Sequence, residues 1–196
     1  MPKLVYYIGI SIDGYIAGPD DEVDFYPISD DYMQWMLDEF GDALPGHIRA
    51  QAGIADAPLT KFDSIIMGRR TYDPALAENI TSPYPHLDQY VVSRDLRVDD
   101  PAITVIRNHP SDAVDMLKLE HSDLDIYLAG GGSLAGSLLP QIDRLVVKTY
   151  PVVAGAGRPA FDTNFNPTRF TFEDVRTFSG GNVVSTYSQE TINSLG

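Results

Sequence analysis

Three consecutive glycines between an apolar run and a helical pattern are the strongest candidates for a ligand-binding site. A turn without side chains lets a ligand approach the backbone, and the first amides of a helix have no partner within that helix. A phosphate or pyrophosphate is the ligand that such a turn favours. The segment comprises the apolar run 125–129, Gly130, Gly131, Gly132, Ser133 and Leu134.

Two further segments concentrate arginine in a chain that is otherwise acidic. Gly68-Arg69-Arg70-Thr71 follows the apolar residues 64–67, and Ser93-Arg94 ends another strand-like run. Ligands of open α/β sheets bind at the carboxyl ends of strands, and the guanidinium fork suits phosphate better than an ammonium group does. Together with the glycines, these segments predict a dinucleotide site. The alternative is that the arginines pair with surface acids and the glycines merely permit close packing.

The standard nucleotide motifs are absent. The sequence contains neither G-x-G-x-x-G nor G-x-x-x-x-G-K-[ST], so it supports neither a standard dinucleotide fold nor a P-loop ATPase. It also has no cysteine and no histidines at ligand spacing, so we expect no metal site.

Candidates for a proton donor and for substrate contacts carry a weaker signal. Asp31, Tyr32 and Trp35 lie at positions i, i+1 and i+4 of a predicted helix, on a stripe able to face a cleft. Acids in a first helical turn also complement the helix dipole, and aromatic residues at helical spacing usually belong to a core. Both interpretations stay open. Lys148 lies within the apolar strand 145–150, where it would bind a substrate anion or cover a sheet edge.

The elements that must position these residues follow from hydrophobic periodicity. We expect a helix that begins at Ser29, an extended loop with at most one helical turn over 42–60, and a helix capped by Ser111. A mixed, mostly parallel eight-stranded sheet flanked by helices, with an antiparallel C-terminal hairpin, is the predicted α/β fold. The predicted strands span residues 3–11, 64–67, 89–93, 103–107, 125–129, 145–150, 169–178 and 183–189.

Length and composition limit the possibilities. The 196 residues fit a single domain, 1–196, and 43% hydrophobic residues provide a sizeable core. A net charge of −14 argues against nucleic acid or anionic membrane as a partner, and it requires a local positive cluster for any anionic cofactor. The lack of cysteine and of a long apolar segment predicts a cytoplasmic protein with no membrane association.

The order of five motifs identifies a family resemblance. The five motifs are residues 11–18, 66–72, 91–94, 128–134 and 151–161. In this order they resemble the dihydrofolate-reductase-like superfamily, closest to the reductase domain of bacterial riboflavin biosynthesis and its stand-alone relatives. The similarity extends from about residue 3 to residue 190 and implies a single-domain dihydrofolate-reductase-like fold.

The resemblance implies that the cofactor is NADPH and that residues of these motifs bind it. In the family, the Gly-Arg-x-Thr segment grips phosphates, the Ser-Arg pair lies beside the adenosine 2′-phosphate, and the glycine turn cradles the pyrophosphate and nicotinamide side. An early loop covers the nicotinamide, and the first Gly–Gly peptide of the turn is typically cis. The matching residues are Gly68, Arg69, Arg70 and Thr71, then Ser93 and Arg94, then Gly130, Gly131, Gly132, Ser133 and Leu134, with Ala17 in the loop.

The resemblance implies an NADPH-dependent oxidoreductase that transfers hydride to a small heterocyclic, carbonyl or imine substrate of pterin, pyrimidine or ribosylaminopyrimidine type. Phosphoribosylaminouracil reductase and dihydrofolate reductase are the two models. Asp31 would contact substrate or relay a proton, and Tyr32 and Trp35 would contact the substrate ring. Lys148, the second candidate catalytic residue beside Asp31, stands where most relatives carry Thr or Ser, at a position that faces the pocket in dihydrofolate reductases. The alternative is a non-catalytic nucleotide-binding or dimerisation module, and the C-terminal strands predict a homodimer.

Overall fold

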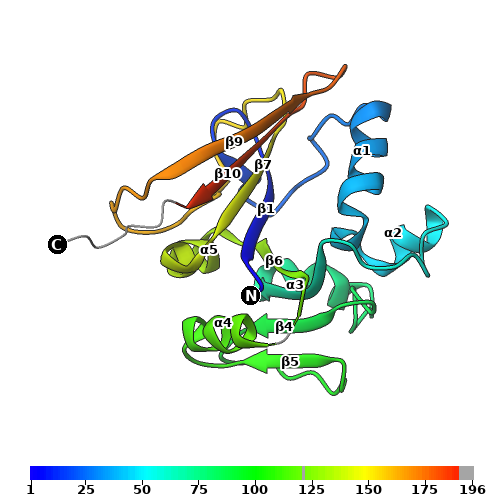
Figure 1. Ribbon diagram of the computed structural model, residues 1–196, viewed down its shortest axis with the longest axis vertical. Helices are drawn as coiled ribbons and strands as arrows, with labels where there is room; N and C mark the ends of the chain where they lie inside the picture. Colours follow the sequence, from blue (N-terminus) through cyan, green and yellow to red (C-terminus); the bar gives the residue numbers. More distant parts are fainter. Residues whose placement is uncertain (121, 190–196) are drawn as a thin grey trace.

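An eight-stranded sheet forms the centre of the computed structural model, which describes residues 1–120 and 122–189 (Figure 1). The strand order is β5-β4-β3-β6-β1-β7-β10-β9. The pairs from β5 to β7 are parallel, and β7, β10 and β9 pair antiparallel. This confirms the predicted mixed sheet and its C-terminal hairpin. The strands are β1 (Leu4–Ile10), β3 (Phe62–Gly68), β4 (Asp88–Val92), β5 (Ile103–Ile106), β6 (Asp125–Gly130), β7 (Arg144–Thr149), β9 (Phe170–Thr177) and β10 (Val183–Gln189).

Helices cover both faces of the sheet, each over its own buried cluster (Figure 1). On one face, Tyr32 and Met36 of α1 (Asp30–Phe40) and Tyr72 of α3 (Arg69–Ala77) pack in one cluster. On the other face, α4 (Pro110–Leu119) and α5 (Gly132–Leu138) contribute apolar residues to a second cluster. Parallel strands buried on both faces explain why their sequences read as continuous apolar runs.

Three local features differ from the sequence-based expectation. A small antiparallel ladder joins β2 (Tyr15–Ala17) to β8 (Arg158–Pro159), two strands too short to show periodicity. Residues 42–60 are more helical than expected, with a 3₁₀ turn at Gly41–Ala43 and α2 at Gly46–Gln51. The cap of α4 is also corrected, because Ser111 lies inside the helix.

His109 precedes α4 with a φ of 49°, in the left-handed region, and Pro110 is the first helical residue. Proline tolerates the first helical position because the amide there has no helical partner. The proline therefore sets the start of α4 in place of a serine cap.

A buried ion pair ties the irregular segment before β3 to the sheet. Arg49 is 2% exposed, and its guanidinium lies 3.5 Å from the Asp42 carboxylate and donates to the Gly41 carbonyl at 2.8 Å. The other Asp42 oxygen accepts the backbone N–H groups of Thr60 and Lys61, both at 2.7 Å. One carboxylate thus satisfies several donors that would otherwise be buried without partners.

The edge of the sheet and the length of the helices bear on self-association and on membrane insertion. β9 is an edge strand, and its Phe172 and Val175 are 56% and 48% exposed. Association of two chains through this edge stays a prediction. No helix of the described part of the chain is long and apolar enough to span a membrane.

We predict that Asp42→Ala lowers the free energy of unfolding by about 3 kcal/mol, because the buried Arg49 guanidinium loses its counter-charge and the backbone amides of Thr60, Lys61 and Phe62 lose their acceptor. Urea denaturation measures the change. Asp38→Ala, which removes an exposed acid bonded to Gln34 on α1, is the control and is expected to change stability by less than about 0.5 kcal/mol. Equal effects of the two substitutions would contradict the role assigned to Asp42.

Candidate functional site

Two adjoining cavities form one groove at the carboxyl ends of β3, β4 and β6. The larger, the arginine cavity, has a volume of about 800 Å³, and the smaller, the inner cavity, about 310 Å³. They are continuous because both are lined by Arg70, Gly131, Gly132, Ser133 and Asp162. Ligands of open α/β sheets bind at this edge.

The groove brings together every residue that the sequence assigned to cofactor binding. The arginine cavity holds Gly68, Arg69, Ser93, Arg94 and Leu134, the inner cavity holds Ala17, Thr71 and Gly130, and Arg70, Gly131, Gly132 and Ser133 line both. These residues come from segments far apart in the chain. Their convergence fits one extended ligand better than it fits separate surface ion pairs.

Positive charge is concentrated in the arginine cavity. Arg69, at the start of α3, pairs with Asp73 and lies 3.9 Å from Asp95, whereas Arg94 is exposed. Arg107, which the sequence analysis missed, also lines this cavity and donates to the Arg94 carbonyl at 3.1 Å. It follows β5 at the same edge of the sheet, so strand order was the only signal that could have revealed it.

The Ser93 hydroxyl stabilises the loop that carries Arg94. It donates to Asp95 at 2.9 Å and accepts the Leu96 amide at 3.1 Å. Ser93 is buried and its oxygen is engaged within the loop. Its contribution to the cavity is therefore to fix the backbone beside the arginines.

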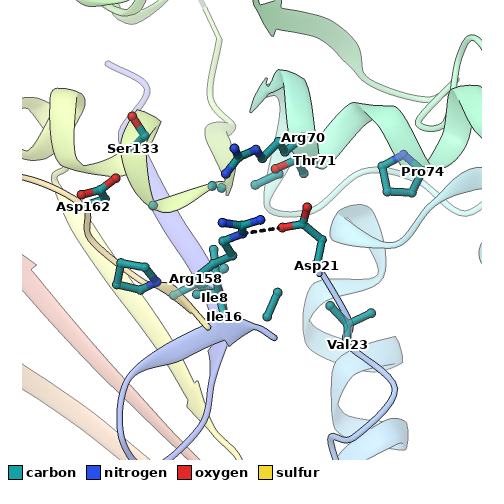
Figure 2. A pocket seen from close by; sticks show the side chains of 16 residues that line it. Ile8, Ile16, Asp21, Val23, Arg70, Thr71, Pro74, Ser133, Arg158 and Asp162 are labelled. Atoms are coloured by element: carbon teal, nitrogen blue, oxygen red, sulfur yellow. Dashed lines mark hydrogen bonds and ion pairs between the residues drawn. The ribbon is translucent and has the colours of Figure 1, made fainter. Parts of the chain in front are cut away.

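The inner cavity is mainly apolar and is crossed by one ion pair (Figure 2). Ile8, Ile16 and Ala17 line one part of it. Arg158 Nε donates to Asp21 at 2.8 Å, which joins the loop after β2 to β8. Such a lining suits a flat ring with few polar atoms, beside the cationic half of the groove.

Glycine backbone forms the boundary between the cavities. The Gly130–Gly131 peptide is cis, as the resemblance implied. A Cβ on Gly131 would meet nothing nearer than Ile16 Cδ1 at 4.0 Å, so this backbone is open to the groove. A Cβ on Gly132 would lie 2.1 Å from the Pro159 oxygen, so only glycine allows β8 to approach α5 this closely. Open backbone flanked by arginines fits a pyrophosphate.

Asp31 does not line either cavity of the groove. Its carboxylate accepts the Ser29 hydroxyl, and it accepts both the amide and the hydroxyl of Ser179, at 2.8 and 2.9 Å, in the β9–β10 turn. These bonds, led by that from Ser29, lower the pKa of Asp31 to about 2. The contacts show a carboxylate that links α1 to the hairpin, and a role in proton relay stays a prediction without support from this geometry.

The predicted ring contacts lie in the core beneath α1. Tyr32 is fully buried, with its hydroxyl 3.0 Å from that of Tyr150. Trp35 is partly buried and packs against Phe178, with ring centroids 5.4 Å apart. Neither residue lines the two cavities, so contact with a substrate ring stays a prediction. Lys148 lies on β7 on this same face of the sheet.

Comparison with known proteins agrees with this architecture. The RibD C-terminal domain family matches residues 2–184. The uncharacterized protein YwjB of Bacillus subtilis is 28% identical over 179 residues, covering 90% of this chain and 92% of YwjB.

Solved structures share the fold at low sequence identity. A riboflavin biosynthesis protein from Shewanella sp. PV-4 is 20% identical with a TM-score of 0.70, and the match covers 97% of this chain and 100% of that one. A pyrimidine reductase-like protein from Corynebacterium diphtheriae is 16% identical with a TM-score of 0.63, covering 97% and 92%. At these identities the likeness shows the fold alone.

We predict that Asp31→Asn lowers the urea midpoint at pH 7. Because the folded-state pKa of Asp31 is depressed, its contribution is present above the unfolded value of about 4 and is lost as pH falls towards about 2. The difference between wild type and variant should therefore narrow over that range. Asp30→Asn, a change at the neighbouring exposed acid, is the control. A difference that stays constant from pH 7 to pH 2 would contradict this assignment.

Proposed function

Since the chain belongs to the RibD C-terminal domain family, we propose that it is an NADPH-dependent reductase of a small heterocyclic, carbonyl or imine substrate. The observation that carries the proposal is the continuous groove, which joins a cluster of arginines to an apolar inner cavity through open glycine backbone. A dinucleotide has the same three parts in the same order: a phosphorylated nucleoside, a pyrophosphate and a flat ring.

Each part of the cofactor has residues suited to hold it. Arg69 and Arg94 would hold the adenosine 2′-phosphate, with Arg107 beside them. The backbone of Gly131 and Gly132 would face the pyrophosphate. Guanidinium groups and backbone amides are the donors that phosphates favour in proteins. In a chain of net charge −14, this is where an anionic cofactor finds a local positive field.

The inner cavity would receive the nicotinamide. Ile8, Ile16 and Ala17 exclude water from a flat ring, and Thr71 supplies a hydroxyl at the same end of the groove. NADPH, when bound, supplies the hydride, so the task of this chain is to align the ring with an acceptor. Substrates of pterin, pyrimidine or ribosylaminopyrimidine type remain the candidates within the proposal.

We expect Arg94→Ala to weaken NADPH binding by about tenfold or more and NADH binding by less than about threefold, because only NADPH carries the phosphate that this guanidinium would bind. Fluorescence titration of each cofactor measures both constants. Arg97→Ala, a change at an exposed arginine outside the groove, is the control. Equal losses for the two cofactors would refute the 2′-phosphate assignment, and a wild-type protein that binds no NADPH would refute the proposed function.

We also expect wild-type protein to oxidise NADPH in the presence of at least one member of a panel of flat carbonyl compounds, pterins and pyrimidines. Loss of absorbance at the nicotinamide band measures the reaction. Tight NADPH binding without oxidation across the whole panel would instead identify a nucleotide-binding module that has no reductase activity.

A further inference from the structure

Lys148 is a cation placed inside an apolar face of the sheet. It lies on β7, in register with Gly9 of β1 and Val184 of β10. Val184 belongs to the buried cluster beneath α1, as do Val146 of β7 and Tyr7 of β1. The Tyr150 ring covers Gly9, since a Cβ there would lie 2.8 Å from Tyr150 Cε2, and the lysine chain extends toward Tyr7, two residues earlier on β1.

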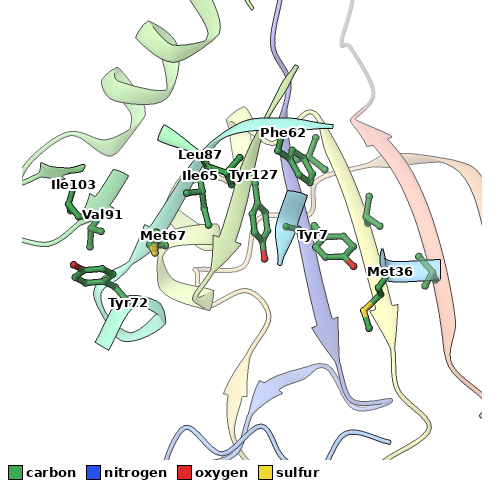
Figure 3. Close-up of a cluster of buried hydrophobic side chains, with 14 of the residues drawn as sticks. Tyr7, Met36, Phe62, Ile65, Met67, Tyr72, Leu87, Val91, Ile103 and Tyr127 are labelled. Carbon is green, nitrogen blue, oxygen red and sulfur yellow. The ribbon is translucent and has the colours of Figure 1, made fainter. Parts of the chain in front are cut away.

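The ammonium group lies against an aromatic ring. Lys148 Nζ is 3.6 Å from the centroid of the Tyr7 ring. Phe40 stacks on Tyr7 with centroids 4.5 Å apart and an interplanar angle of 15°, so these two groups occupy opposite faces of that ring. Figure 3 shows Tyr7 in the buried cluster with Phe62 and Tyr127. A cation–π contact stabilises such an ammonium only in part.

Within residues 1–120 and 122–189, no carboxylate pairs with the Lys148 ammonium. Burial accordingly lowers the pKa of Lys148 to about 7. Lys148 as a residue is half-buried, but an ammonium group held among apolar side chains without a counter-charge is costly to a fold, and at most positions a neutral side chain would be more stable. The cost is explained if the ammonium meets a ligand.

Other unsatisfied donors lie in the same cluster. The Tyr7 hydroxyl and the Trp35 indole N–H are buried without a hydrogen-bond partner among the described residues. Both rings contact Phe40, at 4.5 Å for Tyr7 and 5.3 Å for Trp35. An ammonium, a phenol and an indole N–H all donate, so the complementary ligand presents acceptor atoms such as carbonyl oxygens. A protonated ring would be repelled.

These donors adjoin the groove. β1 and β6 run parallel with Tyr6 opposite Leu128, so Tyr7 neighbours Ala129 on the adjacent strand, and both pack in the same cluster. Ala129 lines the inner cavity. Lys148, Tyr7 and Ala129 therefore lie on one face of three neighbouring strands, which are about 5 Å apart, with Lys148 two residues beyond the position opposite Tyr7.

Few other ionisable groups surround this face. Burial raises the pKa of Tyr7, of Tyr150, which follows β7, and of Tyr32 on α1, so these phenols are neutral near pH 7. Asp31, at the start of α1, is engaged by Ser29 and Ser179. Beyond β10, the charged residues of β9 pair with each other, Arg176 with Asp174 at 4.0 Å. Lys148 is left as the group able to give up a proton near neutral pH.

We propose that Lys148 is the proton donor of the reductase and that its substrate presents a carbonyl oxygen, or an equivalent neutral or anionic acceptor, to this ammonium. The assignment rests on the proposed NADPH-dependent function. As the nicotinamide hydride forms the new C–H bond, the C=O π bond breaks and the oxygen takes a proton from Lys148 Nζ, which gives an alcohol and a neutral amine. Solvent then returns the proton to the amine.

The first test needs no substrate. The chain has four lysines, so their ¹³C-labelled side-chain signals are resolvable, and Lys148→Met assigns the signal of Lys148. We expect Lys148 to titrate near pH 7, apart from the other three, and its signal to shift when NADP⁺ is added. A Lys148 that titrates together with the other lysines, or that does not respond to NADP⁺, overturns the proposal.

The second test measures steady-state NADPH oxidation with flat carbonyl acceptors, among them isatin and 4-carboxybenzaldehyde, and with dihydropterins. We expect oxidation by carbonyl acceptors, with kcat/KM falling above about pH 7 because only the ammonium donates. Lys148→Met should lower kcat/KM by about 100-fold and leave NADPH affinity within about twofold. Lys148→Arg should retain KM but lose kcat, because guanidinium does not release its proton.

Lys61→Met is the matched control. The Lys61 ammonium also lies over an aromatic ring, that of Phe40, but this lysine is exposed. We expect this substitution to leave the rate of NADPH oxidation unchanged. An unchanged rate or pH profile in Lys148→Met overturns the proposal. So does a wild-type enzyme that reduces only dihydropterins. In these cases the protein would still bind NADPH, because Lys148 lines neither cavity of the groove. Intact NADPH binding therefore shows that the role of Lys148 is wrong while the proposed function stands.

Discussion

The close approach of the ends of β3 and β6 is the constraint on which the groove depends. A Cβ on Gly68 would lie 3.5 Å from both the Gly130 oxygen and the Gly131 nitrogen, so the two backbones meet with no side chain between them. Met67 pairs with Gly130 in the ladder, and α3 begins two residues later. The first turn of α3 and the glycine turn consequently face one cavity. Gly130 has a φ of 112°, a backbone conformation that favours glycine, so the turn at the end of β6 depends on this residue type.

The distribution of charge gives this geometry its selectivity. The chain carries a net charge of −14, yet Arg69, Arg94 and Arg107 are gathered at one edge of the sheet. An anionic ligand is repelled by most of the surface and attracted at this one place. The inner cavity differs, because its lining is mainly apolar and Arg158, which lines it together with Arg70, is already paired with Asp21. The groove thus has a cationic end for phosphate and an apolar end for a ring.

The sequence predicted those parts of the site that lie in continuous motifs. The strands were visible because runs buried on both faces are apolar throughout, and the residues that follow β3, β4 and β6 could be placed at one sheet edge by general rules for α/β proteins. Arg107 was missed because it ends β5 without glycine or hydroxyl neighbours. The Arg158–Asp21 pair joins residues 137 positions apart through strands of two and three residues, which have no detectable periodicity.

Asp31 shows a different limit. The sequence predicted its position in the first turn of a helix. It could not predict the partner, Ser179, which lies 148 residues away in a hairpin turn. Only the packing of β10 and β9 beside α1 brings them together. The sequence already showed Lys148 as an anomaly within its strand. That no carboxylate of the described residues pairs with it, and that the Tyr7 hydroxyl has no partner among them, could be seen only in the structure.

Amide hydrogen exchange with and without NADPH tests the central claim most directly, because it reports the contacts of the backbone itself. The account predicts added protection in residues 16–17, 68–71, 93–96 and 130–134, with little change in the β9–β10 hairpin. NADPH binding that protects other segments and leaves the glycine turn exchanging as in the free protein would contradict it.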